Sequence, residues 1–127
     1  MKKRTAPKNL PADKHLLAAD VLKKHRKRID QLDAQILKLL GARFDVVRDV
    51  AKVKIKHDIP AFLGGRVNEV RNNAVELGKK YGIDPDFMRT VYTMLIFQSC
   101  AEEEILKHAA QQAKAAKPAA KTKRAKK

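Results

Sequence analysis

The longest uninterrupted stretch of this chain runs from Lys14 to Lys56 and contains neither proline nor a cluster of turn-forming residues. Its apolar residues recur at steps of three and four, which predicts a single amphipathic helix. They are Ile29, Leu32, Ile36, Leu39, Leu40, Val47 and Val50. We expect Asp13 to be the N-cap, and Pro60 to force the chain out of the helix at the residue before it.

Two shorter helices are predicted after a loop that contains Pro60, Gly64 and Gly65. One should run from about residue 66 to 80 and end at Gly82, and the other from Pro85 to about residue 110, with Asp84 as its N-cap. Nothing reads as a strand, so the sequence predicts an all-α fold of three helices. The residues expected to face inward are Val67, Val70, Ala74 and Leu77 on the second helix, and Met88, Val91, Tyr92, Leu95 and Ile96 on the third.

The first helix is too long for a compact monomer. At about 1.5 Å per residue it would extend roughly 60 Å. A compact chain of this size has a radius of gyration of only about 14 Å. The two shorter helices cannot cover the whole apolar stripe, whereas a second copy of the chain can. We therefore expect an intertwined homodimer, with a bent or broken first helix in a monomer as the alternative.

Most of the positive charge lies outside the predicted helices. The chain has a net charge of +15, but residues 15–108 hold 17 Lys and Arg against 13 Asp and Glu, a net charge of +4. We expect three regions: a basic N-terminal tail at 1–13, a helical domain at 14–110, and an Ala- and Lys-rich tail at 111–127 that is largely disordered beyond a frayed helix end.

Several classes of protein are disfavoured. No apolar run is long enough to cross a membrane or to act as a secretory signal, and the single cysteine, Cys100, rules out an internal disulfide framework, so we expect a cytoplasmic protein. The four histidines are scattered, and no metal-ligand spacing or phosphate-binding glycine loop is present. The sequence thus calls for no metal and no cofactor.

Two cations share a helical face with core residues. Arg43 and Lys54 lie on the same stripe as Val47 and Val50, and Ser99 and Glu103 continue the inward stripe of the third helix. Buried cations need an anionic partner, and arginine binds carboxylates through two parallel hydrogen bonds. The pattern indicates a site for a small dicarboxylate. The alternative is that each cation reaches solvent by itself.

The ordered set of these residues resembles the all-helical class of chorismate mutases, including its aminodeoxychorismate mutase branch. The resemblance covers about three quarters of the chain, up to about Leu106. The matching positions are Arg26, Ile29, Asp30, Leu32, Asp33, Ile36, Leu39, Leu40, Arg43, Val50, Ala51, Lys54, Pro60, Arg66, Gly82, Ile83 and Asp84.

The resemblance implies an isomerase of chorismate metabolism and aromatic amino acid biosynthesis. Arg43 and Arg66 would hold substrate carboxylates, and Arg26 would enter the site from the other subunit. Lys54 would contact the ether oxygen and a carboxylate. Ser99 and Glu103 would face the substrate from the third helix. The reaction is a concerted Claisen rearrangement, which needs a held geometry and stabilised negative charge rather than a cofactor or a catalytic base.

Two positions depart from the better-known family pattern. Val67 stands where many members have a glutamate that contacts the ring hydroxyl, and Glu103 stands where many have glutamine. A carboxyl group donates a hydrogen bond to the ether oxygen only when protonated. We therefore expect activity to improve below neutral pH unless Glu103 stays protonated.

The substrate has three candidates. Chorismate, rearranged to prephenate, is the first because it is the commonest substrate of the family. The segment Gly65-Arg66-Val67, with Cys100 and Glu103, resembles the branch that acts on 4-amino-4-deoxychorismate. The segment Ile59-Pro60-Ala61 resembles the loop of isochorismate-pyruvate lyase.

Two interpretations without catalysis compete with the mutase. The basic tail resembles those of histones and would bind nucleic acid weakly and nonspecifically through phosphates. It lacks aromatic stacking residues, and a solubilising extension is the simpler interpretation. A plain helical dimerisation module would tolerate loss of Arg43 and Lys54 without functional effect.

Overall fold

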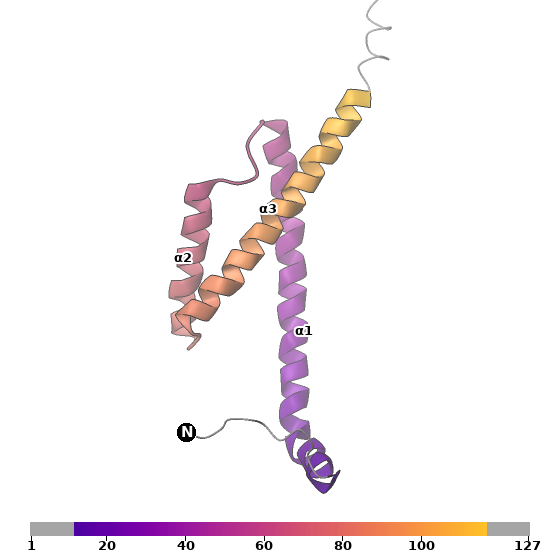
Figure 1. Ribbon diagram of the computed structural model, residues 1–127, viewed down its shortest axis with the longest axis vertical. Coiled ribbons are helices and arrows are strands. Elements are labelled where there is room, and N and C mark those ends of the chain that lie inside the picture. Colours follow the sequence, from indigo (N-terminus) through magenta and orange to yellow (C-terminus); the bar gives the residue numbers. More distant parts are fainter. Residues whose placement is uncertain (1–11, 117–127) are drawn as a thin grey trace, which may run out of the picture. The chain divides into compact units, whose positions relative to one another are not determined.

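The computed structural model describes residues 12–116 and shows three helices, with no strand in that range (Figure 1). They are α1 (Ala12–Lys56), α2 (Gly64–Lys80) and α3 (Pro85–Ala116). The prediction of an all-α fold with one very long helix is confirmed. The predictions for the extreme tails, at 1–11 and 117–127, lie outside the described residues.

The chain divides into two units after Gly41. In the first unit, residues 12–41 form the N-terminal part of α1, and its apolar stripe is open to solvent: Ile36 is 54% exposed and Leu39 is 70% exposed. This exposure agrees with the prediction from helix length, namely that the chain itself cannot cover the whole apolar stripe of α1.

In the second unit, α2 packs against α3 (Figure 1). The two helices lie close together at Gly78, where an added Cβ would lie 2.7 Å from the Met88 side chain and would force that side chain to move. The expectation that Leu77 faces inward is wrong, since it is 53% exposed. The other expected residues hold, since Val67 and Ala74 are buried and Val70 is half-buried, and the buried face continues through Val75 and Gly78.

The turn between α2 and α3 follows the predicted capping residues. Gly82 has a φ of 71°, and the amides of Gly82 and Ile83 donate to the carbonyls of Lys79 and Gly78, which closes α2 in a Schellman motif. Asp84 Oδ2 accepts a hydrogen bond from the Phe87 amide at 2.9 Å, and Pro85 is the first residue of α3. Both caps are confirmed.

The helix ends differ in detail from the predictions. Asp13 lies inside the first turn of α1 rather than at the N-cap, because the helix begins at Ala12. In this position its negative charge interacts favourably with the positive end of the helix dipole. α1 ends at Lys56 as expected. α2 begins two residues early, at Gly64, and α3 continues to Ala116 through strong helix formers. Across residues 12–116, no helix is both long and apolar enough to cross a membrane.

Candidate active site

The second unit contains a pocket of about 460 Å³ between the end of α1, the following loop, α2 and α3. Five of the six predicted site residues line this pocket: Arg43, Lys54, Arg66, Ser99 and Glu103. They come from three helices and span 60 positions of sequence, yet they face one space. The helical periodicity thus predicted that the cations of α1 and the polar residues of α3 face one space, and their roles in the site stay predictions.

The rest of the lining is largely apolar. α1 contributes three valines, α2 contributes two, and α3 contributes an isoleucine, which together give a surface suited to a carbon ring. These residues are Val46, Val47 and Val50, Val67 and Val70, and Ile96. The pocket thus combines charged groups that can hold carboxylates with an apolar wall that excludes water.

Lys54 and Glu103 form the most buried charge pair among residues 12–116. Lys54 Nζ lies 2.8 Å from Glu103 Oε1, and the two side chains are 17% and 9% exposed. The same ammonium donates a hydrogen bond to the Ala61 carbonyl oxygen at 2.8 Å. The contact with Glu103 is one of charge rather than a directed hydrogen bond, since Oε1 receives no hydrogen bond from any described residue. A buried carboxyl oxygen without a hydrogen-bond partner can form a hydrogen bond with a ligand.

Arg43 is held in place without a carboxylate. Its Nη1 donates to Ser99 Oγ at 2.9 Å, and the Ser99 hydroxyl donates to the Leu95 carbonyl at 2.8 Å. The guanidinium carbon also lies 5.9 Å from the centre of the Tyr92 ring, a cation–π distance. None of the ion pairs formed within residues 12–116 includes Arg43, so its charge is available to an anionic ligand.

Arg66 is the most exposed cation of the pocket. Its Nη1 lies 2.7 Å from Glu69 Oε1, one turn further along α2, and both side chains are more than half exposed. Exposed pairs of this kind contribute only about 0–1 kcal/mol. Arg66 can therefore exchange Glu69 for a ligand carboxylate at little energetic cost.

Sequence reasoning missed an ion-pair bridge between α1 and α3. Arg48 donates to Glu102 Oε1 and to Asp45 Oδ1, both at 2.7 Å. The hydrogen bonds that Arg48 donates, first to Asp45 and then to Glu102, raise the pKa of its guanidinium, which stays charged. Because Glu102 precedes Glu103 on α3, the bridge helps to fix the helix that carries the pocket carboxylate. The only sequence signal was the i,i+3 spacing of Asp45 and Arg48.

Cys100 also lines the pocket, where its Sγ lies 3.9 Å from the Ala61 carbonyl oxygen. Burial, and then the negative charge of Glu103, raise the pKa of this thiol. The thiol therefore stays protonated at neutral pH and is a poor nucleophile. Cys100 thus helps to shape the pocket and adds a weakly polar group to its wall.

Arg26 is the predicted site residue that the structure does not bring into this pocket. It belongs to the first unit, where it is exposed on α1. Its contribution across a subunit interface stays a prediction. Within residues 12–116, no three His, Cys, Asp or Glu side chains gather where they could hold a metal ion.

Comparison with known proteins agrees with this arrangement. The sequence profile described as chorismate mutase type II matches residues 25–104. A 4-amino-4-deoxychorismate mutase from Streptomyces pristinaespiralis is 33% identical over 94 residues, which cover 74% of this chain and 73% of the relative. Another from Streptomyces venezuelae is 28% identical over 85 residues, which cover 67% of this chain and 82% of the relative.

A chorismate mutase from Methanocaldococcus jannaschii is 31% identical over 71 residues, which cover 56% of this chain and 72% of the relative. The matched region of the profile contains every residue that lines the pocket. The chain therefore belongs to the chorismate mutase type II family and is an isomerase.

Proposed function

We propose that this protein catalyses the Claisen rearrangement of chorismate to prephenate in the pocket between α1, α2 and α3. The observation that carries the proposal is the gathering of Arg43, Lys54 and Arg66 around an apolar-walled space with one buried carboxyl group, Glu103. Three cations against one acid leave a surplus of two positive charges. A substrate with two carboxylates and no positive group balances that surplus.

The chemistry needs fixed cations and hydrogen-bond donors rather than a cofactor or a catalytic base. Arg43 and Arg66 hold the two carboxylates, which brings the enolpyruvyl arm over the ring. As the C–O bond breaks, Lys54 stabilises the negative charge that develops on the ether oxygen. Ser99 keeps Arg43 oriented, and Glu103 donates a hydrogen bond to the same oxygen when it carries a proton.

4-Amino-4-deoxychorismate is the second candidate substrate, because the two Streptomyces relatives carry that name. Val67 is buried in the pocket and offers no hydrogen bond to a ring hydroxyl, so the pocket does not require one. The amino group of this substrate is protonated at neutral pH, however, and leaves one positive charge of the pocket unbalanced. Because of this unbalanced charge, we rank chorismate above 4-amino-4-deoxychorismate as the substrate.

Separate incubation of the purified protein with chorismate, 4-amino-4-deoxychorismate and isochorismate tests this proposal, with products identified by mass spectrometry and NMR. We expect prephenate from chorismate at the highest kcat/KM. Faster turnover of the amino substrate would replace chorismate with the second candidate, and release of pyruvate from isochorismate would indicate a lyase. Absence of turnover with all three would refute the proposal.

We also propose that the working form is a homodimer in which Arg26 of each subunit completes the site of the other, with residues 14–110 as the mutase domain. The support is the apolar stripe of the first unit, which this chain leaves exposed. A second α1 can bury that stripe at a gain of about 25 cal/mol per Å² of apolar surface.

Replacing Glu103 with Gln is expected to raise kcat/KM at slightly alkaline pH by about tenfold, the equivalent of one hydrogen bond to a charged oxygen. A glutamine amide donates at every pH, whereas the carboxyl group donates only when protonated. Steady-state kinetics of the wild type and the variant at the same pH measure the difference.

The matched control for this experiment is Glu104→Gln, which removes the same charge from the next residue of α3, on the exposed face. It should keep the wild-type kcat/KM. A Glu103→Gln variant that is slower than the wild type would show that a hydrogen bond donated from position 103 does not speed the reaction.

A further inference from the structure

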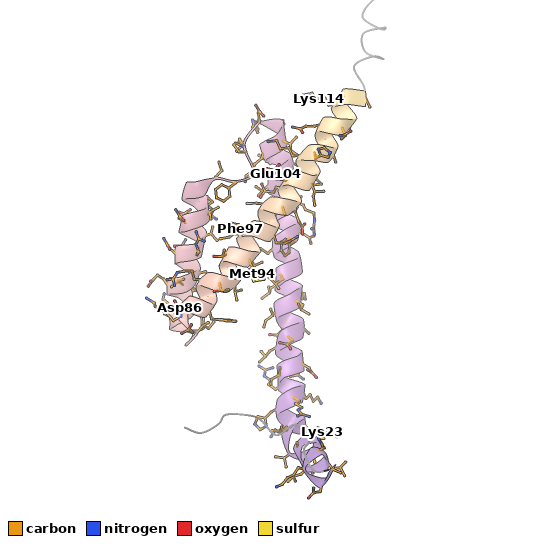
Figure 2. The ribbon with its side chains drawn as sticks, in the orientation of Figure 1. Lys23, Asp86, Met94, Phe97, Glu104 and Lys114 are labelled. Carbon is orange, nitrogen blue, oxygen red and sulfur yellow. The ribbon has the colours of Figure 1, made fainter. Side chains whose placement is uncertain are left out.

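A second, smaller cavity of about 140 Å³ lies where the end of α1 meets the C-terminal part of α3. Lys54 and Asp58 contribute to it from α1 and the turn that follows, and Lys107 and Lys114 contribute from α3. Figure 2 shows Lys114 near the C-terminal end of α3. The family profile ends at residue 104, so the two α3 lysines lie outside the region that it matches.

This cavity carries an excess of positive charge. Lys54 is paired with Glu103, which leaves Lys107 and Lys114 against a single carboxylate, Asp58. Lys107 is half-buried and Lys114 is exposed. Neither Lys107 nor Lys114 takes part in any ion pair formed among residues 12–116. Ammonium groups that line a cavity without an acidic partner are favourable places for an anion, because the anion supplies the missing hydrogen bonds and charge.

The lysines are not needed to cap α1. The carbonyls of Val53, Lys54 and Ile55 accept hydrogen bonds from the amides of residues 57–59, at 3.1, 2.8 and 3.3 Å. The turn that follows α1 thus satisfies the carbonyls that lysines often approach at the end of a helix. The clustering of Lys107 and Lys114 with Lys54 has no explanation in the backbone.

Lys54 lines both this cavity and the catalytic pocket. On the catalytic side, its ammonium is held by Glu103 and the Ala61 carbonyl. An anion bound in the small cavity adds negative charge beside the group that must attract the negatively charged substrate. Binding in one cavity is therefore opposed by binding in the other, through the single positive charge that they share.

We propose that the small cavity is a regulatory site for a small oxyanion, a phosphate or a carboxylate, which Lys107 and Lys114 hold and Lys54 couples to the catalytic pocket. Its occupation raises the KM for substrate. The effect on turnover rests on the proposed mutase function, whereas binding of the anion does not. The volume fits a small anion, and the ring-sized ligand belongs in the larger pocket.

The test is a ¹H–¹⁵N NMR titration of the full chain with inorganic phosphate, and separately with acetate, at constant ionic strength. We expect saturable shifts of amides around residues 107–114, with about tenfold weaker binding in the Lys107→Gln/Lys114→Gln double variant. The tighter of the two anions identifies the ligand type. The control is Lys79→Gln/Lys80→Gln at the end of α2, which removes the same charge and should bind like the wild type.

Kinetics provide the second measurement. Phosphate should raise the KM of the wild type and of the α2 control, and this effect should shrink in the α3 double variant. Shifts confined to the amides of the catalytic pocket, or equal binding in all variants, would overturn the proposal. If no substrate is turned over, the mutase function fails, but the NMR titration still decides whether the anion site exists.

Discussion

Replacing Lys54 with Gln is expected to lower kcat/KM for the rearrangement by about 10²–10³-fold, the loss that follows removal of one fixed donor to a developing oxyanion. The Lys54 ammonium is positioned before substrate arrives, since it lies 2.8 Å from both the Ala61 carbonyl oxygen and Glu103 Oε1. Glutamine keeps most of the length of the side chain but loses the charge. Loss of chorismate absorbance under steady-state conditions measures the effect.

The matched control is Lys52→Gln, which removes the same charge from an exposed position two residues earlier on α1. It should retain wild-type activity. Far-UV circular dichroism and thermal unfolding of both variants separate a local loss from a folding defect. Wild-type kcat/KM in a folded Lys54→Gln variant would remove Lys54 from the mechanism.

Helical periodicity and capping rules were enough to predict the three helices. The signals used were the absence of proline across α1 and the residues Gly82 and Asp84-Pro85 between α2 and α3. Each acts within a few neighbouring residues, so packing between helices does not change its effect. The burial of Gly78 in place of Leu77 was not predictable, because it depends on the approach of Met88 to Gly78, a contact between residues on two helices. Leu77 was misplaced for that reason.

The same distinction applies to the candidate site. Arg43, Lys54, Ser99 and Glu103 were found because each lies on the inward stripe of its own helix. The Ala61 carbonyl, which holds Lys54, was not found because a loop conformation decides where a backbone oxygen points. The pairing of Arg48 with Glu102 was missed because it joins two helices at positions that neither helix marks by its periodicity.

Mixing two inactive variants is expected to restore about one quarter of wild-type activity if the sites are shared between subunits. The variants are Arg26→Ala and Lys54→Gln, each nearly inactive by itself. In a mixed dimer, the subunit with intact Lys54 receives the intact Arg26 of the other, so one of the two sites is complete. Half of the dimers in an equal mixture are mixed. Joint refolding of the two denatured variants, followed by kinetics, measures the recovery.

A second mixture shows whether recovery depends on sharing. Arg43 and Lys54 line the same pocket of one chain, so Arg43→Ala combined with Lys54→Gln leaves each site of a mixed dimer with one defect. This mixture should stay inactive. Recovery in both mixtures would point to a trace of wild-type enzyme. Recovery in neither, with dimers present by light scattering, would place Arg26 outside the partner's site. Recovery in the mixture that contains Arg26→Ala, and not in the other, is the result expected if α1 carries Arg26 into the site of the neighbouring subunit.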